Sequence, residues 1–209
     1  APLLDIYKAV DAKKKIKKSF IGSVIRYDML LHKSKDEATN KAAEEYTCEL
    51  VLNHVSGRLK VAPEHTSDKT LNMMRKPSFK DFHHFKNKFE KINKEHNLNQ
   101  QLIPYFISSH PGCTEADMAE LAAITKDLNF KLEQIQDFTP SPMTLATEIY
   151  YTGYHPYTLE RVYTAKSSDE KTQQRQFFFW YERSAKKSII ASLKKLDRTD
   201  LIRKIYPNG

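Results

Sequence analysis

The chain has 209 residues, of which 40% are hydrophobic and 29% are charged. This balance is typical of a folded, water-soluble protein and excludes an intrinsically disordered one. The length suits one large domain, or one domain with a small appendage. No apolar run approaches the roughly 20 residues of a membrane-spanning helix, and the first residues do not resemble a secretion signal. Cys48 and Cys113 are too few and too far apart for a disulfide framework. We therefore expect a cytoplasmic location and no membrane partner.

The net charge of +8 makes polyanions, and RNA in particular, a class of partner to consider. Much of the lysine content falls in runs at residues 13–18, 186–187 and 194–195. Such runs are typical of solvated surfaces as well as of nucleic-acid interfaces. The chain has no aromatic-basic motif of the RNA-recognition type. It also has no glycine-rich phosphate loop, which argues against nucleotide-triphosphate chemistry of the usual kind.

Four apolar runs predict buried strands, at residues 19–27, 59–62, 102–107 and around Ile135. Helical patterns lie between them. They begin near Ser34 in a predicted capping box, at Ser67, at Ser78 and at Thr114. In the helix that begins at Ser78, a spacing of three and four residues predicts one apolar face, made of Phe82, Phe85, Phe89 and Ile92. Regular alternation of strands and helices predicts βαβ units with a parallel sheet and right-handed connections.

The pattern changes after Pro140. Residues 143–151 predict one more helix and residues 157–165 an extended segment, and from Glu170 onward the chain reads as helical and basic. We place a domain boundary near Gly153. This gives a first domain at residues 1–153 and a mainly helical extension at residues 154–209.

Ionisable and polar side chains follow three of the predicted strands. Glu64 and His65 end the second strand, Ser108, Ser109 and His110 end the third, and Asp137 ends the fourth. Parallel sheets build their sites at the carboxyl ends of their strands, so we expect these residues to meet at one edge. The structural alternative is that they are helix caps and turn residues.

Two further kinds of chemistry stay open for the same loops. A metal bound by His65, His110 and Cys113 would suit a hydrolase, although these residues lack the tight spacing of most metal motifs. A nucleophilic Cys113 would need a histidine close to its thiolate, and His110 is near it in sequence.

Several long segments together resemble the YgiQ-like family of radical S-adenosylmethionine (SAM) proteins. They are Phe-Ile-Gly-Ser-Val-Ile-Arg-Tyr-Asp at 20–28, Leu-Lys-Val-Ala-Pro-Glu-His-Thr-Ser-Asp at 59–68, Ile-Pro-Tyr-Phe-Ile-Ser-Ser-His-Pro-Gly-Cys at 103–113 and Gln-Asp-Phe-Thr-Pro-Ser-Pro-Met-Thr at 136–144. Residues 150–153, 174–175 and 200–202 resemble that family's C-terminal extension. The resemblance covers nearly the whole chain.

The resemblance implies a [4Fe–4S] cluster held by a Cys-x-x-x-Cys-x-x-Cys loop, which cleaves SAM to a 5′-deoxyadenosyl radical. This chain has two cysteines and no such loop, so we expect no metal or cluster bound to it and no activity from it alone. The chain looks like the second part of the barrel together with the extension. Its expected partners are a missing N-terminal half that carries the cluster, and a substrate that the sequence does not identify.

The resemblance also implies roles by position. The strand ends of the family contact SAM, which assigns cofactor binding to Glu64, His65, Ser108, Ser109, His110, Asp137 and Phe138. Arg26 and Tyr27, at the exit of the first predicted strand, are assigned to the substrate cavity.

The sequence thus predicts an α/β fold, a parallel four-stranded partial (β/α)6 barrel with a mainly helical C-terminal extension. The predicted function is the C-terminal part of a radical SAM enzyme that shapes the SAM and substrate cavity. The alternatives are a non-catalytic basic RNA-binding module and a metal hydrolase that uses His65 and His110.

Overall fold

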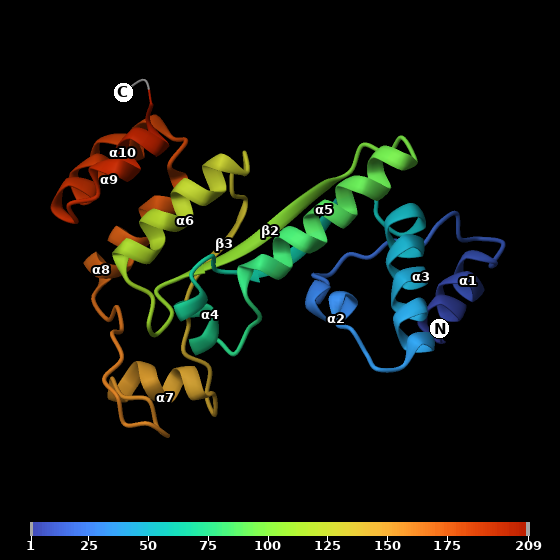
Figure 1. Cartoon of the computed structure of the whole chain (residues 1–209), viewed down its shortest axis with the longest axis horizontal. Helices are drawn as coiled ribbons and strands as arrows, with labels where there is room; N and C mark the ends of the chain where they lie inside the picture. Colours follow the sequence, from blue (N-terminus) through green and yellow to red (C-terminus); the bar gives the residue numbers. More distant parts are fainter. Residues whose placement is uncertain (1, 208–209) are drawn as a thin grey trace. The chain divides into compact units, whose positions relative to one another are not determined.

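A computed structural model describes residues 2–207 of the chain (Figure 1). The chain divides into two compact units, each of which makes most of its residue contacts within itself. The first consists of the residues up to 62 together with 80–104, and the second of residues 63–79 and those from 105 onward. Gly153, where a domain boundary is predicted, lies inside the second unit, and that boundary stays a prediction.

Three parallel strands form one open sheet in the order β1-β2-β3. They are β1 (Arg58–Glu64), β2 (Gln101–Ser108) and β3 (Gln134–Asp137). In the ladder between β2 and β3, Tyr105 lies opposite Gln134 and Ser108 lies opposite Asp137. Because β2 and β3 end at this last pair, their final side chains lie at the same level of the sheet.

The prediction of four strands is wrong, because residues 19–27 do not form a ladder. Ile25 makes a single parallel bridge to Val61, in which its N–H donates to the carbonyl of Lys60 at 3.2 Å. The N–H of Ile21 donates instead to the carbonyl of His54. A strand needs successive bonds to one neighbour, so this apolar segment is extended chain with one point of pairing.

The first unit holds its core between helices and the first parts of β1 and β2. Its helices are α1 (Pro2–Asp11), α2 (Tyr27–Leu31), α3 (Glu37–Asn53) and most of α5 (Phe79–Glu95). On α5 the predicted apolar face is confirmed, because Phe82, Phe85, Phe89 and Ile92 are all buried. The predicted cap of α3 is displaced by two residues, since Asp36 and not Ser34 accepts the first helical N–H groups.

The second unit contains the ends of the strands and most of the C-terminal half of the chain. Its helical elements are α4 (Asp68–Met73), α6 (Glu115–Asp127), α7 (Leu145–Thr152), α8 (Ser168–Arg175), the 3-10 turn η1 (Gln176–Phe179), α9 (Arg183–Lys195) and α10 (Thr199–Ile205). In Figure 1, α6 runs beside α10, and η1 also packs on α6. Phe177, Phe178 and Ile189 are fully buried in this unit.

The helices predicted from Glu170 onward are confirmed, and so is the helix start predicted at Thr114, where Thr114 and Asp117 form a capping box that opens α6. The stretch 157–165, predicted as extended, is largely irregular and is tied back by one antiparallel bridge between Tyr154 and Arg161. Across residues 2–207, the helices are all too short or too polar to cross a bilayer.

Candidate functional site at the strand ends

The last residue of β1 has an unusual backbone. Glu64 has a φ of +67°, and the N–H of His65 donates to the carbonyl of Pro63 at 2.8 Å. Together these make a γ-turn of the rare positive-φ type, which is strained for a residue with a Cβ. The Glu64 carboxylate is held by the Lys76 ammonium at 2.9 Å. Ser109, the residue after β2, also has a positive φ, of +60°. Strained residues of this kind concentrate at binding and catalytic sites.

The ends of β2 and β3 are joined by side chains as well as by the ladder. The Ser108 hydroxyl donates to one oxygen of Asp137, and the Arg175 guanidinium donates to the other at 3.0 Å. Arg175 comes from α8, so an extension helix takes part in this cluster. The imidazole of His110 packs edge-on against the Phe138 ring, with 4.9 Å between ring centroids. These contacts bring four of the predicted cofactor residues together in pairs.

A buried hydrogen-bond network joins three segments that are far apart in the sequence. His65, after β1, accepts at Nδ1 from the N–H of Ser67 at 2.9 Å. The other ring nitrogen, Nε2, lies 3.4 Å from Sγ of Cys113, in the loop after β2. The same sulfur lies 3.3 Å from Oε1 of Gln174, on α8. His65, Cys113 and Gln174 are each at most 1% exposed.

The donors and acceptors in this network leave one consistent arrangement. Since Nδ1 of His65 accepts a hydrogen bond, the neutral ring carries its proton on Nε2 and donates it to Sγ of Cys113. The thiol in turn donates to Oε1 of Gln174 at 3.3 Å, which is nearer than its other acceptor, the carbonyl of Thr114 at 3.8 Å. The Gln174 amide closes the network, because its Oε1 accepts from the N–H of Ser109 at 2.8 Å and its Nε2 donates to the carbonyl of Cys113 at 2.9 Å.

Burial keeps both titratable members of the network uncharged. It lowers the pKa of His65 to about 4, against a smaller opposing effect of the Asp117 carboxylate. Burial raises the pKa of the Cys113 thiol, and Asp117 raises it further. A nucleophilic cysteine needs a thiolate, so this environment does not support that role. The imidazole in contact with the thiol is that of His65, not His110 as the sequence suggested.

The structure gives no support to a metal centre either. Among residues 2–207, no group of three or more histidine, cysteine, aspartate or glutamate side chains is arranged to hold an ion. His65 Nε2 is engaged by the Cys113 thiol, and Nδ1 of His110 faces the carbonyl of Pro111 at 2.9 Å. The predicted trio of ligands is thus divided between two separate sets of hydrogen bonds.

The two residues predicted for the substrate cavity belong to the first unit. The Arg26 guanidinium pairs with Asp28 at 2.6 and 2.8 Å. Tyr27 is 4% exposed and packs on the rings of Phe82 and Phe85. Tyr27 is therefore part of the hydrophobic core of that unit, and a role of either residue in a cavity stays a prediction.

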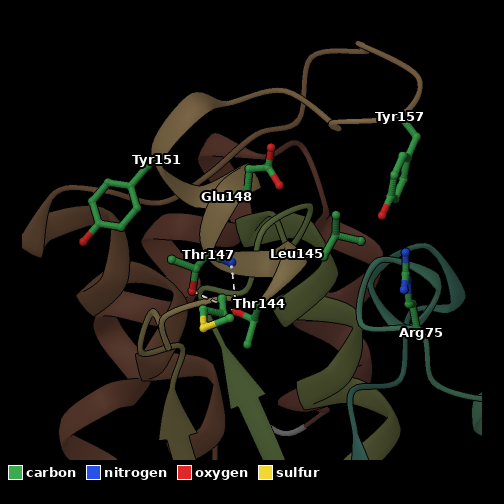
Figure 2. Close-up of a pocket in the computed structure, with 8 residues that line it drawn as sticks. Arg75, Thr144, Leu145, Thr147, Glu148, Tyr151 and Tyr157 are labelled. Carbon is green, nitrogen blue, oxygen red and sulfur yellow. Dashed lines mark hydrogen bonds between the residues drawn. The ribbon is translucent and has the colours of Figure 1, made fainter.

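The residues that the sequence did not single out for the site come mainly from the extension. Gln174 is a buried amide in a helix of otherwise polar, largely exposed residues, and the sequence indicated it only as part of the resemblance to the family's extension, with no role in the site. A cavity of about 490 Å³ was also not predicted. It is lined by Arg75, Met143, Thr144, Leu145, Thr147, Glu148, Tyr151 and Tyr157 (Figure 2).

Comparison with known proteins gives matches along nearly the whole chain. Residues 133–204 match a family model described as a domain of unknown function, DUF3362. Over 205 residues, 98% of this chain, it is 67% identical to a UPF0313 protein of Bacteroides thetaiotaomicron and 63% identical to one of Porphyromonas gingivalis. A UPF0313 protein of Methanocella arvoryzae is 42% identical over 187 residues. The chain spans about a third of the length of these relatives, with 33%, 32% and 30% covered in turn.

We predict that Gln174→Leu lowers the free energy of unfolding by about 3 kcal/mol. The substitution leaves the N–H of Ser109 and the carbonyl of Cys113 buried without a partner, and each such group costs about 1–3 kcal/mol. Gln173→Leu is the matched control, because Gln173 is exposed on the same helix and its substitution should change stability by about 0.5 kcal/mol or less. Denaturant unfolding of both variants checks this. Equal stabilities would contradict the network.

We also predict a histidine-dependent loss of stability in acid. The unfolded chain protonates His65 near the ordinary histidine pKa of 6.5, whereas burial lowers the pKa in the folded chain to about 4. Between these values the unfolded state binds more protons, so stability falls as the pH falls through this window. The difference corresponds to about 3 kcal/mol. Unfolding free energies measured from pH 7 to pH 4 should fall by that much more in the wild type than in His65→Gln. Parallel curves would show that His65 protonates freely in the folded state.

Proposed function

We propose that this chain forms the SAM-binding and substrate-binding side of a radical SAM barrel in the intact protein. Its matches to UPF0313 proteins support membership in that family. In this proposal the three parallel strands are part of a (β/α)6 barrel that other residues of the intact protein complete. The observation that carries it is the meeting of Ser108 and Asp137 at the carboxyl ends of two adjacent parallel strands. Barrels and open parallel sheets bind their ligands at that edge.

The polar atoms at the strand ends fit a nucleoside-like group. The hydroxyls of Ser109 and Thr66 are buried, and no hydrogen-bond partner for either lies among residues 2–207. A buried hydroxyl without a partner is costly, and a ligand with donors and acceptors would satisfy both. In the proposal Asp137 accepts from ribose hydroxyls, while Phe138 and His110 offer ring surfaces to the adenine.

The residues of this chain do not fit the iron–sulfur cluster. A cluster needs at least three thiolates, and this chain has two cysteines. Cys113 is buried and hydrogen-bonded to Gln174, and Cys48 lies on α3 in the first unit. In the intact protein the cluster and SAM would supply the radical chemistry. This chain would bind SAM, orient it through the strained Glu64 turn and exclude water from it. Arg175 would hold the Asp137 carboxylate in the orientation that accepts a ligand.

RNA binding is the second candidate. The five lysines of residues 13–18 are all exposed, and the ammonium of Lys18 lies 5.8 Å from the centroid of the half-exposed Phe20 ring. Positive charge beside an exposed aromatic ring is a common means of holding single-stranded nucleic acid. A salt titration separates the two candidates, because affinity that comes from phosphate contacts falls steeply as salt rises.

In the full-length protein, Glu64→Ala should weaken SAM binding about tenfold and leave the iron content unchanged. The reason is that Glu64 lies at the proposed ligand edge, whereas the cluster would be held elsewhere. Anaerobic calorimetry and iron analysis measure the two effects. Glu45→Ala, an exposed glutamate on α3, is the control and should change neither. Unchanged SAM affinity in Glu64→Ala would remove this residue from the proposed site.

A further inference from the structure

The cavity beside α7 has the size of a ligand site. Its volume is about 490 Å³, within the range of small-molecule sites. Three parts of the second unit line it. Arg75 follows α4, residues 143–151 enter and form α7, and Tyr157 comes from the irregular segment after that helix. Figure 2 shows Tyr151 on one side, Tyr157 above Arg75 on the other, and Glu148 between them.

The two tyrosines offer large exposed rings that the fold holds in place. Tyr151 is 67% exposed and Tyr157 is 75% exposed. The ring of Tyr151 packs edge-on against Tyr150, with centroids 5.3 Å apart. The ring of Tyr157 packs edge-on against His155 at 5.8 Å, and the guanidinium carbon of Arg75 lies 5.9 Å from its centroid. Supported rings with exposed area are what proteins use to stack the bases of nucleic acids.

Two opposite charges line the same cavity without pairing. Among residues 2–207, neither Arg75 nor Glu148 forms an ion pair or a side-chain hydrogen bond. Arg75 has a φ of +55°, so its backbone is held in a conformation that residues with a Cβ adopt at a cost. A guanidinium is suited to phosphate, and a carboxylate accepts hydrogen bonds from ribose hydroxyls.

The two threonine hydroxyls of the cavity are already used. The hydroxyl of Thr144 donates to that of Thr147 at 2.9 Å, and Thr147 donates to the carbonyl of Ser141 at 2.7 Å. Charged recognition is thus left to Arg75 and Glu148, with the two tyrosine rings and their hydroxyls beside them. A free amino acid would pair with both charges, but it would leave most of the volume and both rings without contact.

We propose that this cavity binds a ribonucleotide, with Arg75 on the phosphate, Glu148 on the ribose hydroxyls and Tyr157 or Tyr151 stacked on the base. The ligand is either a free nucleotide or a nucleotide unit of RNA, because both present the same three groups. None of the residues that line this cavity is among the strand-end residues assigned to SAM, and the proposal does not depend on radical chemistry.

The test is a titration of the purified chain with AMP, adenosine and a five-residue oligoadenylate, followed by calorimetry. Arg75→Gln should weaken AMP at least tenfold and leave adenosine nearly unchanged, because only AMP carries the phosphate. Glu148→Gln should remove the preference for AMP over its 2′,3′-dideoxy analogue. Either Tyr157→Ala or Tyr151→Ala, whichever removes the ring that stacks on the base, should weaken AMP, adenosine and the oligoadenylate. Arg161→Gln is the matched control, since Arg161 is exposed on the same segment but does not line the cavity. Thermal melts establish that each variant is folded.

Comparing the affinities for AMP and for the oligoadenylate also identifies the source of the nucleotide. Equal affinity for AMP and the oligoadenylate indicates a free nucleotide, whereas an oligoadenylate at least tenfold tighter, with the same dependence on Arg75, indicates RNA. The proposal fails if the folded wild-type chain binds neither AMP nor the oligoadenylate at millimolar concentration. It fails equally if Arg75→Gln and both tyrosine variants leave binding intact, or if SAM displaces AMP completely, since the cavity would then not be a separate nucleotide site.

Discussion

The side-chain amide of Gln174 is the contact on which the organisation of the second unit depends. It accepts from the backbone of Ser109, donates to the carbonyl of Cys113 and accepts from the Cys113 thiol. The thiol is bonded to His65, so one amide on α8 connects the loops that follow β1 and β2. Buried polar networks are costly when incomplete and specify one arrangement when complete. These bonds fix where the two loops lie.

This network gives the C-terminal extension a role in building the strand-end site. Gln174 and Arg175 are neighbours on α8; the first holds the loop after β2, and the second holds Asp137 at the end of β3. Both lie within the segment that matches DUF3362. Burial keeps His65 and Cys113 uncharged, which suits a positioning role rather than acid–base or nucleophilic work. The strain at Glu64 and Ser109 is maintained by the contacts around them.

Much of this fold could be predicted from local sequence, and the network could not. The spacing of Phe82, Phe85 and Phe89 predicted the buried face of α5, and Thr114 with Asp117 predicted the start of α6, because periodicity and capping are local. The prediction of a strand at residues 19–27 was wrong, because strand pairing depends on a neighbouring segment that a local pattern does not reveal. Gln174 and the Arg75–Glu148 cavity were missed for the same reason, since their partners are distant in sequence.

The most direct test of the network is the rate at which a thiol reagent labels the two cysteines of the native chain. Cys48 is half-buried and lies outside the network, whereas Cys113 is buried with its proton donated to Gln174. At pH 8 we expect Cys48 to be labelled in the folded protein and Cys113 to be labelled only when the second unit unfolds, and mass spectrometry of the labelled peptides would distinguish the two. Comparable labelling of both cysteines under native conditions would contradict the buried network.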